Sequence, residues 1–412
     1  MTILKALLDQ RRAFAARGLK LNMTRGVPCK EQLELSTPML HITDTSSRGI
    51  DCRNYGQLEG LPEAREFFAG YLNSVYEETV VGGNSSLSLM HDVIAHARLR
   101  GVPGDTDEIW RKQCVFLCLG PGYDRHFTIC ESLGINMLPV RMTADGPDMD
   151  QVRSFVQNKS VVGMWLTYPY HNPTGITYSD ETLRALISMK TANGGFRIFL
   201  DKAYAVHDLT ERRARLLDVR AESLKCGTQD RVFQFCSTSK ITWAGAGVCA
   251  MSASPTNVAW FQRWLFAQTI GPDKLNQLRH VRFLKNMEGV YGLMAEHRKI
   301  LRPKFDTVDK VLRTCIGQTD IASWTTPEGG YFISLEVEQG CAKRVVELAS
   351  GVGVELTKAG ATHPYGRDFE DKYVRLAPTY PSLIELDDAS EVIANSVHIA
   401  SIEKRENRRV VP

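Results

Sequence analysis

Residues 231–248, R-V-F-Q-F-C-S-T-S-K-I-T-W-A-G-A-G-V, constrain the fold more than any other segment. The apolar start predicts a buried strand, which runs into a cluster of hydroxyl residues and then into Lys240. Desolvation at the end of such a strand is expected to lower the pKa of this lysine, because no carboxylate adjoins it in the sequence. A solvated turn lysine is the more common interpretation of any single lysine, so this one needs partners elsewhere in the chain.

Two further segments end apolar strands in polar residues. Y-P-Y-H-N-P-T-G breaks a strand at Asn172, and F-R-I-F-L-D-K-A-Y ends one at Asp201, with Tyr204 shortly after it. Strands, such as the apolar run at residues 161–166, alternate along the chain with helical stretches, such as residues 275–297, which look like one helix long enough to bridge two domains. This alternation predicts a mainly parallel sheet with helices on both faces. Ligands bind at the carboxyl ends of the strands in such a sheet, so these residues and Lys240 are expected to share one site.

The order and spacing of these motifs resemble the fold-type I pyridoxal-phosphate (PLP) enzymes, specifically the class I/II aminotransferases. The pattern is most similar to the bacterial aspartate-aminotransferase-like subgroup, from L-N-M-T-R-G at residue 21 to V-R-L-A-P-T at residue 374. The resemblance implies an α/β, PLP-dependent transferase fold of type I, with a mainly parallel, seven-stranded type of sheet and a smaller α+β domain. It divides the chain into an N-terminal helix and arm belonging to the small domain (1–48), a large PLP-binding domain (49–290) and a C-terminal small domain (291–412).

The same resemblance implies catalytic functions for the residues at the strand ends. Lys240 would hold PLP as a Schiff base, and would move the substrate Cα proton once an amino acid displaces it. Asp201 would pair with the protonated ring nitrogen, so that the ring accepts the electrons of the carbanion. Tyr204 and Asn172 would hydrogen-bond the ring oxygen and help to set the pKa of the Schiff base.

Further cofactor-binding residues are implied in other segments. V-V-G-G-N-S-S-L-S-L opens a helix whose free N–H groups, with the hydroxyls of Ser85 and Ser86, would bind the cofactor phosphate, although such a sequence alone is more often only a cap. Ser237 is assigned to the cofactor as well. Tyr123, on the turn G-P-G-Y-D-R-H-F, is expected to stack on the pyridine ring. Tyr55 would reach the phosphate of the neighbouring subunit, which predicts a homodimer with shared active sites.

The substrate is expected to bind around Arg375, which lies within an apolar segment and needs an anion. A structural ion pair is the alternative, whereas the resemblance makes Arg375 the anchor of the substrate α-carboxylate. Asn172 and Gly26 are assigned to the substrate as well, the glycine because a missing Cβ lets the backbone approach a carboxylate. Spacing does not choose the arginine that would bind a second carboxylate; the candidates are Arg25, Arg125 and Arg279.

Several positions depart from the patterns of the resembled families. Val248 stands where many class I enzymes have a phosphate-binding arginine, although the subgroup shares the A-G-A-G-V sequence. The other departures lie in motifs near the expected site and favour a specialised substrate, with neutral drift as the alternative. They are Tyr168, Pro169 and Tyr170 before the Asn-Pro-Thr-Gly turn, Lys202 after Asp201, and His363 in T-H-P-Y-G.

Composition limits the classes of partner. A net charge of +3 over 412 residues gives no electrostatic reason to expect nucleic acid or an anionic membrane, and no apolar run is long enough for a membrane span. The ten cysteines include no C-x-x-C pair, so we expect reduced thiols in a cytoplasmic protein and no metal site. Residues 1–18 are predicted to form a structural amphipathic helix, with an organellar transit peptide as the alternative.

Three functions compete on these grounds. The first is a PLP-dependent aminotransferase that moves an amino group from an L-amino acid, with aspartate as a candidate, to a 2-keto acid. The second uses the same PLP site for elimination, replacement or C–C bond formation at the β or γ carbon of a specialised amino acid, because one electron sink serves all these reactions. The third, a non-enzymatic PLP-binding regulatory module, is disfavoured because no helix-turn-helix pattern precedes the fold and the full set of catalytic residues would be superfluous.

Overall fold

The computed structural model describes residues 3–410, and its main feature is a sheet of eight strands within that range. In order across the sheet, the strands are β4 (Thr79–Val81), β11 (Cys249–Ser252), β10 (Val232–Ser237), β9 (Arg197–Asp201), β8 (Val161–Thr167), β5 (Val115–Gly120), β6 (Asn136–Thr143) and β7 (Gly146–Pro147). β11 runs antiparallel to both of its neighbours and β7 runs antiparallel to β6, whereas the other neighbours pair in parallel. The predicted α/β fold with a mainly parallel sheet is therefore confirmed, and the two-residue β7 adds an eighth strand.

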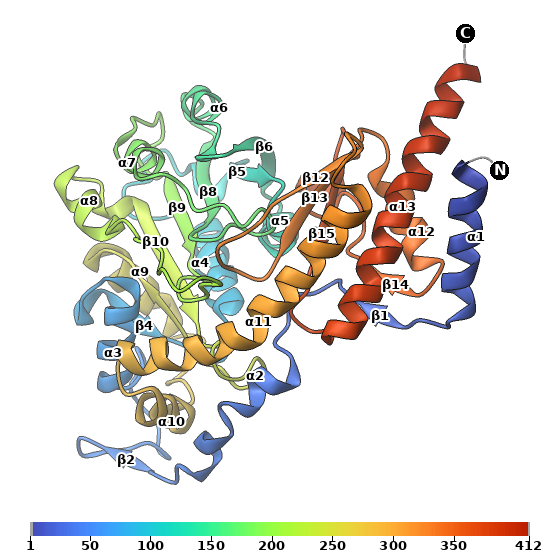
Figure 1. Cartoon of the computed structure of the whole chain (residues 1–412). Helices are drawn as coiled ribbons and strands as arrows, with labels where there is room; N and C mark the ends of the chain where they lie inside the picture. The colour runs from blue at the N-terminus through green and yellow to red at the C-terminus, as the bar shows by residue number, and fades with distance from the viewer. Residues whose placement is uncertain (1–2, 411–412) are drawn as a thin grey trace.

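Helices cover both faces of this sheet, as predicted (Figure 1). β8 is buried along its whole length, because both of its faces are covered, and its sequence V-V-G-M-W-L-T is accordingly almost continuously apolar. One face packs against α4 (Ser86–Arg100), α5 (Asp124–Ser132) and α9 (Pro255–Leu265). The other face packs against α6 (Met149–Phe155), α7 (Asp180–Ser188) and α8 (Val219–Lys225).

A further apolar cluster forms around the segment that follows β10. Ile241 is fully buried there against α3 (Pro62–Leu72) and α10 (Lys274–Leu284). The chain reaches this cluster from the short elements α2 (Lys30–Glu34), β2 (Ser46–Ser47) and β3 (Ile50–Asp51). Because Ile241 is packed in this way, the backbone on either side of it has a fixed position.

The remaining strands form a smaller α+β unit, which lies on the right in Figure 1. β12 (Ala322–Trp324), β13 (Ile333–Val337) and β15 (Tyr373–Leu376) make an antiparallel sheet beside α12 (Ala342–Ser350) and α13 (Leu383–Val410). The N-terminal helix α1 (Ile3–Ala16) lies alongside α13, and β1 (Leu21–Asn22) pairs in parallel with β14 (Val354–Glu355). The first residues of the chain therefore pack with its last third.

The long helix α11 (Met287–Ile316) runs from α3 and α10 to α13 and so links the two sheets (Figure 1). The sequence suggested a single helix over residues 275–297, and this prediction is wrong. Lys285 has φ +63°, which ends α10, and the Asn286 side chain then accepts a hydrogen bond from the backbone N–H of Gly289 (3.1 Å) to begin α11. The predicted domain boundaries at residues 48 and 290 stay predictions.

Over residues 3–410, no helix combines the length and the apolar character that a membrane span requires.

Candidate active site

A cavity of about 290 Å³ lies at the carboxyl ends of the parallel strands. Ends of β8, β9 and β10, the turn before α5 and the start of α4 all contribute to its wall, as expected for a ligand site in such a sheet. The structure therefore brings together most of the cofactor-binding residues that the sequence indicated. They are Ser85, Ser86, Tyr123, Asn172, Asp201, Tyr204, Ser237 and Lys240.

Lys240 follows the carboxyl end of β10 and extends towards the ring of Tyr204. Its Nζ lies 5.0 Å from the centroid of that ring. Burial in the cavity wall lowers the pKa of Lys240, and the nearby Asp201 carboxylate opposes part of that decrease. The site thus favours a neutral amine, the form that attacks a carbonyl carbon and accepts a proton.

Asp201 is the last residue of β9, and two neighbours lie close to its carboxylate. One carboxylate oxygen, Oδ1, accepts a hydrogen bond from the backbone N–H of Ala203 (3.1 Å), and Oδ2 lies 3.4 Å from Nε2 of His126. The His126 ring stacks on Trp165, with centroids 4.4 Å apart and planes 7° from parallel. These contacts fix a buried carboxylate so that it faces the cavity.

His126 and Thr167 are two residues that the sequence analysis did not assign. His126 follows Tyr123 at helical spacing, and the two rings meet edge to face with centroids 5.0 Å apart. Thr167 ends β8 and lines the cavity. The helical spacing was a usable signal for the histidine, whereas a threonine at a strand end carries no signal of its own.

Unpaired polar atoms face this cavity. Asn172 and Thr167 are each 2% exposed, yet Asn172 Oδ1 and Thr167 Oγ1 have no hydrogen-bond partner anywhere in residues 3–410. Leaving a buried polar atom unpaired costs about 1–3 kcal/mol, so such atoms are expected where a ligand completes the hydrogen bonding.

The start of α4 forms the part of the cavity suited to an anion. Ser85 is the N-cap residue and Ser86 opens the helix, and both line the cavity, so the backbone N–H groups that lack helical partners at a helix start lie at its wall. Ser237 and Ser239 add hydroxyls from the other side, and Ser239 is held by a hydrogen bond to the backbone oxygen of Asn84 (3.0 Å).

Arg375 reaches this region from β15 of the smaller unit and is not one of the residues that line the cavity. Its Nη1 lies 3.3 Å from Asp124 Oδ1, its Nη2 lies 3.3 Å from the Thr24 backbone oxygen, and its Nε lies 3.3 Å from Thr357 Oγ1. Its guanidinium carbon also lies 4.9 Å from the centroid of the Phe332 ring. The ion pair that the sequence analysis kept as an alternative is present, but every one of its polar contacts is long.

Gly26 and Tyr55 also lie outside the cavity wall. A Cβ on Gly26 would lie 2.6 Å from Cζ of Phe332, so the glycine allows that ring to pack beneath Arg375. Tyr55 is 82% exposed and does not enter the cavity of its own chain.

The residues that depart from the family pattern lie around the cavity without lining it. Lys202 is buried, and desolvation lowers its pKa to about 8. Tyr170 donates a hydrogen bond to Asp208 Oδ1 (2.5 Å). His363 packs against Gly120, where a Cβ would lie 2.8 Å from its Cδ2.

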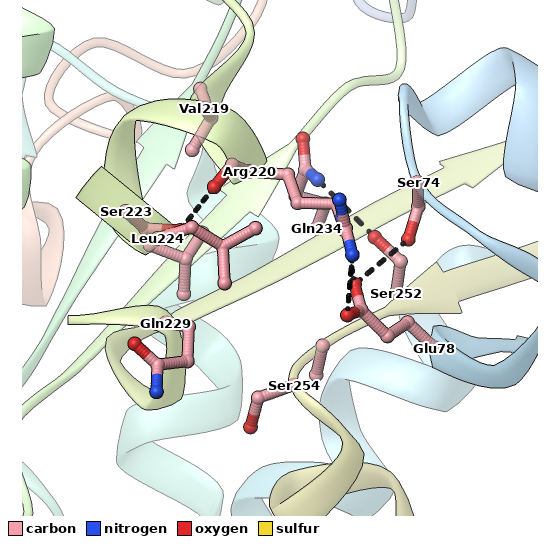
Figure 2. Close-up of a pocket in the computed structure, with 12 residues that line it drawn as sticks. Ser74, Glu78, Val219, Arg220, Ser223, Leu224, Gln229, Gln234, Ser252 and Ser254 are labelled. Carbon is pink, nitrogen blue, oxygen red and sulfur yellow. Dashed lines mark hydrogen bonds and ion pairs between the residues drawn. The ribbon is translucent and has the colours of Figure 1, made fainter. Parts of the chain in front are cut away.

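A second polar pocket lies beside α8 and is shown in Figure 2. Its cavity of about 20 Å³ has room for little more than a water molecule. Arg220 bonds Glu78 through two contacts of 2.6 and 2.9 Å, and Gln234 donates to Ser252 Oγ (3.2 Å). Because its charged groups already satisfy each other, this pocket has the character of a structural contact.

Comparisons with known proteins agree with the site. The family model described as "Aspartate amino-transferase" matches residues 2–409. A Mycolicibacterium smegmatis protein described as an aminotransferase is 44% identical over 406 residues, covering 96% of this chain and 95% of that protein. The crystal structure of an aspartate transaminase from Corynebacterium glutamicum is 39% identical, has a TM-score of 0.94, and matches over 97% of this chain and 96% of that chain.

A more distant match is the α-aminoadipate aminotransferase LysN of Thermus thermophilus, solved in complex with N-(5′-phosphopyridoxyl)-L-leucine. It is 19% identical, has a TM-score of 0.77 and matches over 95% of both chains, so it shows the fold alone. The resemblance inferred from the motifs is confirmed by the matches along the whole sequence. The chain belongs to the aspartate aminotransferase family of fold-type I, PLP-dependent enzymes.

Proposed function

We propose that this aminotransferase attaches PLP to Lys240 as a Schiff base and uses the wall of the 290 Å³ cavity to hold it. The observation that carries the proposal is that Lys240 and Asp201 face one cavity in which the buried Asn172 Oδ1 and Thr167 Oγ1 have no partner in the described chain. Cavity size, unpaired buried polar atoms and a helix N-terminus suit the aldehyde, ring and phosphate of PLP. Bound PLP supplies an electron sink for the charge that develops when the substrate Cα loses its proton.

Each residue of the cavity wall would have a distinct task towards PLP and the substrate. Lys240 would carry the proton from the substrate Cα, and its lowered pKa favours the neutral form that this requires. Asp201 would accept a hydrogen bond from the protonated ring nitrogen, and the contacts of Ala203 and His126 would keep it in place. Tyr204 and Asn172 bind the ring oxygen.

Other residues orient the reactants. Tyr123 stacks on the pyridine ring, and the start of α4 with Ser85, Ser86 and Ser237 binds the phosphate. Arg375 binds the substrate α-carboxylate, because a planar carboxylate can replace its three contacts of 3.3 Å with shorter, bidentate bonds.

Aspartate is the proposed amino donor and a 2-keto acid the acceptor. The support is that the Corynebacterium glutamicum structure, at 39% identity, is described as an aspartate transaminase. Gly26 contributes to the substrate site through Phe332, whose ring it allows to lie beneath Arg375.

A homodimer in the cytoplasm is the proposed functional state. Tyr55, Phe266 and Ile270 are all more than half exposed, and a Cβ on Gly271 would lie 2.2 Å from the backbone oxygen of Gly56, so the two loops that carry them are packed together. A partner subunit would cover this apolar surface and receive Tyr55 at its phosphate site. Apart from Cys341, the cysteines of residues 3–410 are free thiols, which agrees with a reducing compartment.

A single-turnover experiment tests the proposal. The PLP-loaded enzyme is mixed with a panel of amino acids in the absence of any keto acid, and products are followed by absorbance and mass spectrometry. Release of one 2-keto acid per active site, with aspartate the best donor, is expected. Loss of a group from the β or γ carbon, with catalytic turnover in the absence of an acceptor, would instead identify an elimination or replacement enzyme.

A further inference from the structure

The backbone oxygen of Lys240 receives hydrogen bonds from two side chains that do not line the cavity. His207 Nε2 lies 3.2 Å from this oxygen, and Tyr331 Oη lies 3.3 Å from it. Both side chains are buried, and their rings meet edge to face at a centroid distance of 5.3 Å. A backbone carbonyl accepts only, so His207 carries its proton on Nε2 and Tyr331 donates its hydroxyl proton.

Two more buried side chains extend this arrangement. Gln32 Nε2 lies 3.0 Å from Tyr331 Oη and 2.8 Å from His297 Nδ1, and Gln32 Oε1 accepts the backbone N–H of Cys29 (3.1 Å). The contact with Cys29 fixes which end of the Gln32 amide is the oxygen. Its two N–H groups then donate to Tyr331 and His297, so that the direction of each hydrogen bond is determined.

The members of this network come from distant parts of the sequence. Gln32 lies on α2, which packs against α11, the helix that carries His297. Tyr331 leads into β13 of the smaller sheet. Its position is fixed because segments 207–209 and 328–330 bond each other: Gly330 N–H donates to His207 O (2.9 Å) and Leu209 N–H donates to Glu328 O (2.7 Å).

The network also keeps charge away from the lysine. Burial lowers the pKa of His207 to about 3 and that of His297 to about 4, so both rings are neutral at physiological pH. The positive charge of Lys240 is one of the influences that lower the pKa of His207, because a cationic His207 would be repelled by a protonated Lys240.

We propose that Gln32, Tyr331 and His207, none of which lines the cavity, position Lys240 for its reaction by holding its backbone oxygen. The amine of Lys240 would have to reach both the cofactor and the substrate Cα, so small shifts of its backbone would slow its reactions with each of them. The N-terminal arm, the smaller sheet and the large sheet thereby set the place of one atom. This inference rests on the proposed assignment of Lys240.

The test compares isosteric variants by three measurements: the rate at which apoenzyme captures PLP, the separate values of kcat and KM, and the melting temperature of the apoenzyme. Tyr331→Phe deletes one donor and should slow capture and lower kcat roughly five- to tenfold, the size of one net hydrogen bond, with KM little changed. Tyr365→Phe is the matched control, since the Tyr365 hydroxyl accepts the backbone N–H of Met137 on β6 (2.7 Å), away from Lys240. The control should leave capture and kcat unchanged.

Two further variants separate positioning from stability. His207→Gln keeps an N–H donor and should retain most of the rate of PLP capture. His207→Leu has no donor, so its rate of PLP capture should fall by about the same factor as in Tyr331→Phe. Gln32→Leu should add nothing when Tyr331→Phe is already present, because Gln32 acts through that hydroxyl.

Two outcomes would overturn the proposal. One is a melting temperature that falls while capture and kcat stay at the wild-type values, and the other is fully additive losses in the double variant. Failure of the Lys240 assignment has a different signature: Lys240→Ala would still hold PLP covalently after borohydride reduction, whatever the network variants do.

Discussion

Strand β10 carries two polar regions that differ in a simple way. Gln234, inside the strand, lines the pocket of Figure 2, and Ser237, at its carboxyl end, lines the large cavity. In the first region Glu78 and Arg220 bond each other and Gln234 donates to Ser252. In the second, considering the described residues, buried oxygens of Asn172 and Thr167 remain without a partner.

The difference shows what polar groups contribute at each place. Paired groups around a cavity of about 20 Å³ hold α8 against the sheet and leave nothing for a ligand to bind. Unpaired groups around about 290 Å³ make the chain less stable alone and ready for a partner molecule. The presence of polar groups distinguishes the two regions less well than whether those groups are already paired.

Removal of the lysine tests the comparison most severely. Lys240→Ala should lower kcat by about 10³- to 10⁴-fold, because both the covalent attachment and the proton-transfer group are lost. After borohydride reduction, peptide mass spectrometry should find no PLP fixed to this variant. Lys202→Met, which removes another buried lysine, should still give a modified peptide that contains Lys240. An adduct on the Lys240→Ala chain would assign the attachment elsewhere.

Asp201→Asn should have the next largest effect. The amide cannot stabilise a protonated ring nitrogen as a carboxylate does, so kcat should fall by about 10²- to 10³-fold while PLP remains bound. Steady-state kinetics and the cofactor content of the purified protein measure the two parts. Unchanged turnover would refute the assignment of Asp201 to the ring nitrogen.

Glu78→Gln should affect stability and leave activity intact. The substitution leaves Arg220 without its bidentate partner, and we expect a loss of about 1–3 kcal/mol in the free energy of unfolding, measured by denaturant titration. Glu296→Gln removes an exposed pair with Lys299 and should change stability little. A fall in kcat for Glu78→Gln at unchanged stability would mean that this pocket has a catalytic function.

Asn172→Leu should show the opposite pattern. It removes an unpaired buried oxygen, so the melting temperature of the apoenzyme should stay level or rise, while affinity for PLP should fall roughly tenfold. Thermal unfolding of the apoenzyme and a PLP titration give the two values. The comparison fails if Asn172→Leu lowers the stability of the apoenzyme as much as Glu78→Gln does.

Mild acid should destabilise the folded protein through His207 and His297, the two buried histidines of the network that contacts Lys240. The pKa of His207 is lowered to about 3 and that of His297 to about 4, whereas the unfolded chain titrates near 6.5. Below that value the unfolded state binds more protons than the folded state, so stability is present above 6.5 and is lost as the pH falls towards 4.

Between pH 7.5 and pH 5.5, denaturant titrations should show the free energy of unfolding falling by about 1 kcal/mol per histidine. His207→Gln should remove the contribution of one histidine to this dependence of stability on pH, whereas Glu78→Gln should leave the dependence unchanged. Equal slopes in the wild type and His207→Gln would contradict the buried, neutral state of that ring.

Local patterns were sufficient for much of the fold. Apolar runs such as V-V-G-M-W-L-T predicted buried strands, because a strand covered on both faces excludes polar residues. The break between α10 and α11 was missed, because Lys285 adopts φ +63° although the residue is not glycine and gives no local signal. Strand-end polarity and the family resemblance together indicated eight residues that the structure gathers around one cavity, and the positions of Arg375 and Tyr55 outside its wall could not be read from spacing.

The sequence by itself determined the family, the mainly parallel sheet and the kinds of residue at the strand ends, because these depend on local periodicity and on motif order. Tertiary structure alone decided which polar groups pair. Gln32, His207 and Tyr331 meet at the backbone oxygen of Lys240, and Glu78 meets Arg220, only because distant elements pack together. Hydrogen bonding is short in range and directional, so it depends on the positions of atoms that no sequence interval specifies.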